Sequence, residues 1–194
     1  MIWIGVVVAA ALLIELLILY PNRVNLAGRQ ADFKGFVASM RTDILGCQAA
    51  LNDGYAALAR IHQGDVKQLN NAKTIISQDE AYCTLAVNSD LYNLATLSPP
   101  NDLNRYDLTP VTKNLYAWAY PGAAGILADS EKLLVDPASR SALADIRTRI
   151  KNMNYLLNLV NNDLSKVSSQ LKLAPQTVSL DPTGKMPLFL RSEV

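Results

Sequence analysis

Apolar residues recur every three or four positions along most of the chain, which is the spacing of one face of an α-helix. A first stripe extends from Phe33 to Ile61. The strongest stripe continues without a break through Leu143, Ile146, Ile150, Met153, Leu157, Val160, Leu164, Val167 and Leu171. No segment alternates apolar and polar residues between hairpin turns, so we expect no strands. The pattern predicts an all-α fold with coiled-coil-like spacing.

Turn-forming residues divide this pattern into four predicted helices. The breaks are Gly64-Asp65, residues 96–109 with Pro99-Pro100, Pro121-Gly122, and Asp136-Pro137. The first break predicts a hairpin after which the second helix continues to about Ala95. The others predict one long connection, a kink in a third helix that Thr109-Pro110 opens, and the start of a fourth helix. We therefore expect an antiparallel four-helix bundle with long helices and a kinked third helix over residues 22–174, followed by an irregular tail over 175–194.

The first twenty residues form the longest apolar segment of the chain. Residues 2–20 hold one charged side chain, Glu15, and nineteen helical residues cover about 28 Å, close to the hydrocarbon thickness of a bilayer. Neither a basic leader nor a small-residue cleavage motif flanks the segment, which argues against a signal peptide. We predict a single-pass transmembrane anchor at residues 1–21 that Pro21-Asn22 ends, with the lipid bilayer as its first partner.

Two signals disagree about the orientation of this anchor. Arg23, Arg29, Lys34 and Arg41 follow the span and no basic residue precedes it, which favours a cytosolic bundle. The cysteine pair favours an oxidising compartment. Because acidic residues are interspersed among these cations, we expect the bundle to be extracytoplasmic rather than cytosolic.

Cys47 and Cys83 are placed to form a disulfide. Cys47 lies seventeen residues before Gly64, and Cys83 lies eighteen residues after Asp65. In an antiparallel hairpin that turns there, both cysteines reach the same height, about 26 Å from the turn. The alternative is a pair of buried, unpaired thiols. We predict the disulfide, because a matched height is improbable by chance.

Composition and charge remove several function classes. The 18 basic and 17 acidic residues give a net charge of +1, which provides no basic face for nucleic acid. His62 is the only histidine, and the four glutamates are too few for a di-iron site. No metal-binding, phosphate-binding or nucleophile motif occurs. The sequence predicts a protein that is not an enzyme and that uses no metal or cofactor.

Three groups of residues are candidate contact surfaces. In the span, Glu15 and the small residues Gly5 and Ala9 could meet a membrane partner, although Glu15 could also simply reach toward headgroups. Near the predicted kink, the aromatics could hold a partner or ligand, or could instead close the core: Tyr116, Trp118, Tyr120 and Pro121. On the fourth helix, Arg140, Arg147 and Lys151 share one face, which either meets an anionic surface or is only solvated.

These features together predict a non-enzymatic, single-pass, membrane-anchored helical bundle. We expect it to act as an accessory, assembly or protein-interaction subunit of a membrane or cell-envelope complex. One alternative is an extracytoplasmic sensory bundle with a ligand pocket near Trp118 and Pro121. Another is a cytosol-facing, membrane-tethered scaffold with reduced thiols.

Overall fold

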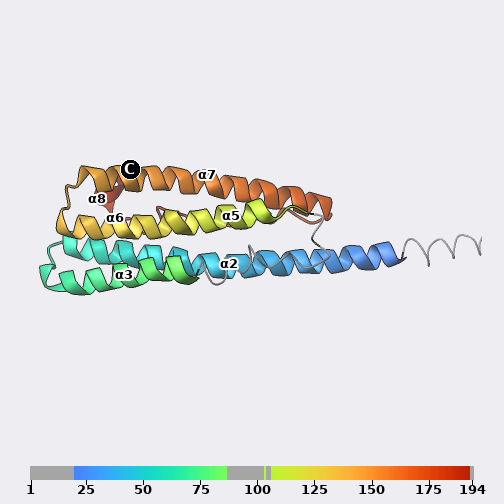
Figure 1. Cartoon of the computed structure of the whole chain (residues 1–194), viewed down its shortest axis with the longest axis horizontal. Coiled ribbons are helices and arrows are strands. Elements are labelled where there is room, and N and C mark those ends of the chain that lie inside the picture. The colour runs from blue at the N-terminus through green and yellow to red at the C-terminus, as the bar shows by residue number, and fades with distance from the viewer. Residues whose placement is uncertain (1–19, 87–102, 104–105, 193–194) are drawn as a thin grey trace, which may run out of the picture.

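A computed structural model describes residues 20–86, 103 and 106–192, and these residues form a bundle of antiparallel helices (Figure 1). The elements are α2 (Tyr20–His62), the short 3₁₀ helix η2 (Val66–Gln68), α3 (Leu69–Ala86), α5 (Thr109–Ala117), the π-helical turn η5 (Trp118–Ala123), α6 (Ala124–Val135), α7 (Arg140–Gln170) and α8 (Leu188–Arg191). The described part of the chain contains no strand. The predicted all-α helical bundle is confirmed.

The helices form two layers. Figure 1 shows the α2–α3 hairpin lying along a second pair, in which α5, η5 and α6 follow one another and α7 returns antiparallel to them. Between the layers α6 contacts both α2 and α3, and α7 packs on α5 and α6. Met40 and Ile44 of α2 and Ile146 and Met153 of α7 are buried in this core. This burial is the main force that holds the layers together.

The α2–α3 hairpin turns where the sequence predicts it. Gly64 adopts a φ of 99°, a left-handed conformation that glycine tolerates best. Cys47 and Cys83 lie opposite each other on the two helices, with a Cα–Cα distance of 5.0 Å, and their sulfur atoms are bonded. The predicted disulfide is confirmed.

The beginning of α2 differs from the prediction. The helix includes Pro21 and Asn22, so the predicted break at this dipeptide is wrong. None of the described helices is long and apolar enough to span a membrane. The predicted anchor, with Gly5, Ala9 and Glu15, lies outside the described residues up to position 19, as do the predicted end of the second helix and most of the long connection.

The fourth predicted helix begins later than expected. α7 starts at Arg140, not at Pro137. Oδ1 of Asp136 accepts a hydrogen bond from the backbone N–H of Ala138, which holds these residues in a turn. The predicted kink of the third helix is present at η5, where Tyr120 leaves helical geometry with φ −136° and ψ 116°.

The chain after α7 packs against the bundle. Residues 173–181 are neither helix nor turn, and the tail ends in the four-residue helix α8. Val178, Met186 and Leu190 are buried. The tail therefore extends the hydrophobic core past the end of the last long helix.

Candidate functional site

The kink at η5 interrupts the third helix in the middle of the bundle. Pro121 follows Tyr120 through a cis peptide bond, and both side chains are exposed. Their neighbours Trp118, Ala119 and Gly122 are buried. The kink therefore turns one short segment of backbone and two side chains toward solvent, while the residues on either side stay in the core.

The predicted aromatic cluster separates into a buried and an exposed part. Trp118 is 0% exposed and belongs to the core, and its Nε1 has no acceptor among the described residues. Tyr116 is half-buried against the core, whereas Tyr120 is 45% exposed. The Tyr116 and Tyr120 rings meet edge to face, with centroids 6.2 Å apart. The exposed part of the cluster is Tyr120 and Pro121.

A cavity of about 240 Å³ opens between this kink and α7. It is lined by Ala117, Pro121, Gly122, Arg149, Asn152, Met153, Tyr155 and Leu156. We call it the Pro121 cavity. Its surface is mainly apolar, and the side chains in its lining that carry polar groups are those of Arg149, Asn152 and Tyr155. The volume is below that of most drug-sized ligand sites and suits one large side chain or a small apolar molecule.

The guanidinium of Arg149 is held in place at the edge of the Pro121 cavity. Nε donates to Oδ2 of Asp129 at 3.0 Å, and an Nη group donates to the carbonyl of Pro121 at 2.8 Å. Asp129 is 1% exposed and also accepts a hydrogen bond from Lys132 at 2.6 Å. This hydrogen bond, together with the negative charge of Asp129, raises the pKa of Lys132. The ion pair therefore ties α7 to the kinked helix beside the cavity.

Gly125 leaves the space that Arg149 occupies. A Cβ at this position would collide with the guanidinium. A larger residue here would displace the guanidinium from its present position.

Several cavity residues were missed in the sequence. Arg149 is a cation of the fourth predicted helix but is not among the candidate contact residues. It lies one turn from Ile146 and Met153, so its position beside the buried stripe was the available signal. Asp129 similarly lies inside a run of buried residues that includes Leu127 and Leu133. A charged residue in such a run usually has a partner, but the sequence does not identify which one.

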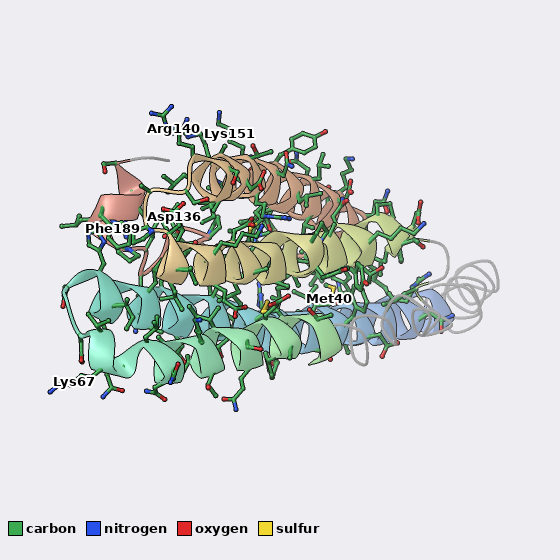
Figure 2. All side chains as sticks on the ribbon, turned by 60° about the vertical axis from the view of Figure 1, so that its left-hand side comes forward. Met40, Lys67, Asp136, Arg140, Lys151 and Phe189 are labelled. Atoms are coloured by element: carbon green, nitrogen blue, oxygen red, sulfur yellow. A yellow bond between two sulfur atoms is a disulfide. The ribbon has the colours of Figure 1, made fainter. Side chains whose placement is uncertain are left out.

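The predicted cation row lies beside the cavity rather than in it. Arg140, Arg147 and Lys151 are exposed on α7, and Figure 2 shows Arg140 and Lys151 pointing away from the bundle. The outward positions that follow at helical spacing, Asn154 and Asn158, carry no charge. α7 therefore presents a basic strip over its first half and a neutral one after it.

A second group of charges lies away from the cavity. Burial, and to a lesser extent the charge of Asp53, raises the pKa of Asp79 on α3 to about 6. Burial also raises the pKa of Glu80, with contributions from Glu131 and Asp129 on α6.

In the part of the chain that the structure describes, no three histidine, cysteine or acidic side chains are grouped so that they could bind a metal ion. His62 stacks on Phe189 with ring centroids 3.7 Å apart.

No protein-family model, curated protein or solved structure matches this chain. The function is therefore inferred from the geometry and charge of the Pro121 cavity and its surroundings.

Proposed function

We propose that this protein is a non-enzymatic, membrane-anchored helical bundle that binds another protein of a membrane or envelope complex, and that the Pro121 cavity receives an apolar side chain of that partner. The observation that carries the proposal is the preformed apolar cavity with exposed aromatics beside it. Tyr155, which lines the cavity, is 62% exposed, and Tyr120 precedes Pro121 on the other side. Tyrosine and arginine beside a pocket are typical of the residues that dominate binding energy in protein interfaces.

The surroundings of the cavity are rigid, which favours binding. The Arg149–Asp129 ion pair fixes the kink to α7, and the disulfide fixes α2 to α3. A site that is already formed avoids the entropy loss of ordering its side chains when a partner arrives. The basic strip of Arg140, Arg147 and Lys151 lies on the same helix and would contact acidic groups of the partner.

The proposed location combines the anchor and the disulfide. The apolar segment at residues 1–21 supports a single-pass tether. A disulfide persists in oxidising compartments and is rare in the cytosol, which supports an extracytoplasmic bundle over a cytosolic scaffold.

A sensory or ligand-binding bundle is the second candidate, and the same cavity favours it. A compact apolar ligand, about the size of one aromatic ring, would fit the Pro121 cavity. A thermal-shift screen with small apolar compounds separates the two candidates: a shift that Asn152→Trp abolishes supports a ligand, and its absence supports a protein partner.

Filling the cavity tests the protein-binding proposal. Asn152 lines the cavity and is exposed, so Asn152→Trp places an indole over the opening without altering the core. Asn158→Trp makes the same change at an exposed position of α7 outside the cavity. We expect the wild-type chain and Asn158→Trp to retain a stoichiometric partner when purified from native membranes, and Asn152→Trp to lose it. A partner retained by Asn152→Trp would exclude the cavity as the binding site, and a monomer without any partner would contradict the function.

A further inference from the structure

The outward face of α7 changes in character along the helix. Figure 1 shows α7 as the outermost helix of the second pair, so one side of it faces solvent. Beyond the basic strip, Tyr155, Asn162 and Ser169 follow one another on this side at intervals of seven residues, and all three are exposed. Asp163 and Lys166 are the only charged residues between Lys151 and Lys172, and their side chains pair with each other at 2.9 Å. The second half of the outward face is therefore polar but carries no excess charge.

A shallow hollow of about 610 Å³ lies on this neutral half of α7. We call it the serine hollow, and its described lining consists of Asn162, Ser165, Lys166, Ser169 and Gln170. The volume falls within the range of small-molecule sites. Because the lining offers mainly hydroxyl and amide groups, a ligand would be held there by hydrogen bonds.

The hydrogen-bonding groups of this lining have no partner in the described part of the chain. This holds for the hydroxyls of its two serines and for its two side-chain amides. A hydroxyl offers one donor and two acceptor positions, and an amide offers two donors and an acceptor. The serine hollow therefore presents donors and acceptors side by side.

The tail explains the polar residues on another side of α7. Nδ2 of Asn161 donates to the carbonyl of Val178 at 3.0 Å, and Oδ1 accepts from the N–H of the same residue at 2.7 Å. Oγ of Ser168 accepts from the N–H of Gln176 at 3.0 Å. Asn161 and Ser168 thus hold the tail, whereas no such contact explains the neighbouring residues of the serine hollow.

The tail then continues along α2. Three side chains of α2 bind main-chain groups of the tail: Arg41 at Thr177, Gln48 at Asp181, and Asn52 at Lys185. Residue numbers rise together in both partners, so the tail runs parallel to α2. None of these contacts involves the serine hollow, which the tail leaves open.

Serine and asparagine are unfavourable choices at these positions of α7. Both are poorer helix formers than alanine, lysine or glutamate, because their side chains compete for main-chain hydrogen bonds. Asn162 and Ser169 are exposed and Ser165 is half-buried, and no hydrogen bond to another described element offsets their effect on the helix. A helix that needed only a soluble face would carry lysine and glutamate here. The composition of the hollow therefore suits a ligand better than it suits the helix.

We propose that the serine hollow binds an uncharged oligosaccharide. Sugar hydroxyls both donate and accept hydrogen bonds, which matches the mixed donors and acceptors of the lining. The pairing of Lys166 with Asp163 leaves no excess cation, so an anionic ligand would gain little electrostatic attraction there. The serine hollow shares no residue with the Pro121 cavity, so its ligand is independent of the proposed function.

An exposed aromatic ring favours a chain of sugars over a single one. Tyr155 is 62% exposed and lies on the same side of α7 as Asn162. The two residues are two helical turns apart, or about 10 Å along the axis. The tyrosine ring offers an apolar face with a polar edge, on which a further sugar ring can pack.

Titration of the purified full chain with uncharged tetrasaccharides tests the proposal. The probes are cellotetraose, maltotetraose and the tetramer of N-acetylglucosamine, and tetragalacturonic acid is the anionic comparison. By calorimetry we expect at least one uncharged probe to bind with a dissociation constant of about 1 mM or lower, and the anionic probe to bind about fivefold more weakly. Absence of binding by all three uncharged probes, or equal binding of the anionic one, would overturn the proposal.

Two double variants locate the binding site. Ser165→Ala/Ser169→Ala removes both hydroxyls of the hollow and replaces them with a better helix former, so we expect the fold to be retained. Ser39→Ala/Ser77→Ala is the matched control, because these serines are exposed on α2 and α3. The first variant should bind the preferred probe about fivefold more weakly and the control as the wild-type chain does, while the melting temperature of both rises slightly. Unchanged binding by the first variant would exclude the serine hollow as the site.

Discussion

At the scale of single residues, Asp129 holds two cations beside the candidate site. It is nearly inaccessible to water, yet it is charged and pairs with both Lys132 and Arg149. Asp129 is buried, whereas the side chains of Lys132 and Arg149 are 59% and 31% exposed. Removing Asp129 therefore costs its charge-assisted hydrogen bonds, while water still solvates both cations.

We expect Asp129→Ala to lower the free energy of unfolding by about 2 kcal/mol, because Arg149 loses its charged acceptor and the buried contacts of the carboxylate are lost. Urea denaturation measures the change. Asp163→Ala is the matched control: Asp163 also pairs with a lysine three residues later, but that pair is exposed, and its loss should change stability by less than about 0.5 kcal/mol. Equal effects of the two substitutions would contradict the structural role of Asp129.

Asp79 predicts a pH dependence of stability. Its pKa is raised to about 6 by burial and then by Asp53, above the ordinary value of 3.8 that it has in the unfolded chain. The folded state therefore favours the protonated carboxyl, and this residue makes the protein less stable as the pH rises from about 4 to about 6.

Asp79→Asn should therefore stabilise the protein at pH 7 but not at pH 4. Since the side chain is only partly buried, solvent screening limits the gain to about 1 kcal/mol. Chemical denaturation at the two pH values measures it, with Asp65→Asn in the exposed turn as a control. A gain that is the same at both pH values would show that charge is not its cause.

At the scale of elements, two glycines of α2 differ in whether packing limits a larger side chain, so that substituting each one distinguishes the effect of helix propensity from that of packing. Gly35 has nothing near its missing side chain, whereas a Cβ on Gly54 would collide with the Leu127 side chain of α6. Leu127 is fully buried, so its side chain would have to shift within the core. Gly54 therefore permits α2 and α6 to approach closely.

We expect Gly35→Ala to stabilise the protein by about 0.5–1 kcal/mol through helix propensity alone. Gly54→Ala should instead destabilise it by about 1 kcal/mol, because the cost of overpacking exceeds the same gain in propensity. Thermal unfolding of the two variants gives the comparison directly. Stabilisation by Gly54→Ala would mean that the helices can separate freely at this point.

The disulfide stabilises the α2–α3 hairpin. It closes a loop with a sequence separation of 36 residues, for which the chain-entropy model gives about 4 kcal/mol. Cys47→Ala/Cys83→Ala should lower the free energy of unfolding by about this amount, and reductant should lower wild-type stability while leaving the double variant unchanged. Two free thiols in non-reducing mass spectrometry would contradict the bond.

The elements differ in how far the sequence predicts them. The long periodic stripes, the Gly64 turn and the equal spacing of Cys47 and Cys83 are local or follow from helix geometry, and each is confirmed. The start of α7 was placed too early, because the Asp136 turn competes with the helix that a proline would open. The site was predicted only in part. Pro121 lines the cavity, whereas Tyr120 does not and Trp118 is core. The pairing of Arg149 with Asp129 depends on how α6 and α7 are brought together.

At the scale of the whole molecule, the disulfide and the predicted anchor together predict on which side of the membrane the bundle lies. We expect a membrane-impermeant protease to digest the bundle in intact cells or spheroplasts, because the disulfide favours an oxidising compartment. Alkylation before and after reduction should show both cysteines oxidised in vivo. Protection from protease together with two reactive thiols would instead support the cytosol-facing scaffold.

The parallel course of the tail along α2 gives the molecule a mechanical property. α2 begins at one end of the bundle and the tail finishes at the other (Figure 1). A pulling force between Tyr20 and Arg191 would therefore load the hydrogen bonds from Arg41, Gln48 and Asn52 in shear and simultaneously, rather than unzip them one after another. The tail thus lies in the line of tension between a tether at the start of α2 and any load attached at the carboxyl end, and it would transmit that tension to α2 without first passing it through α7.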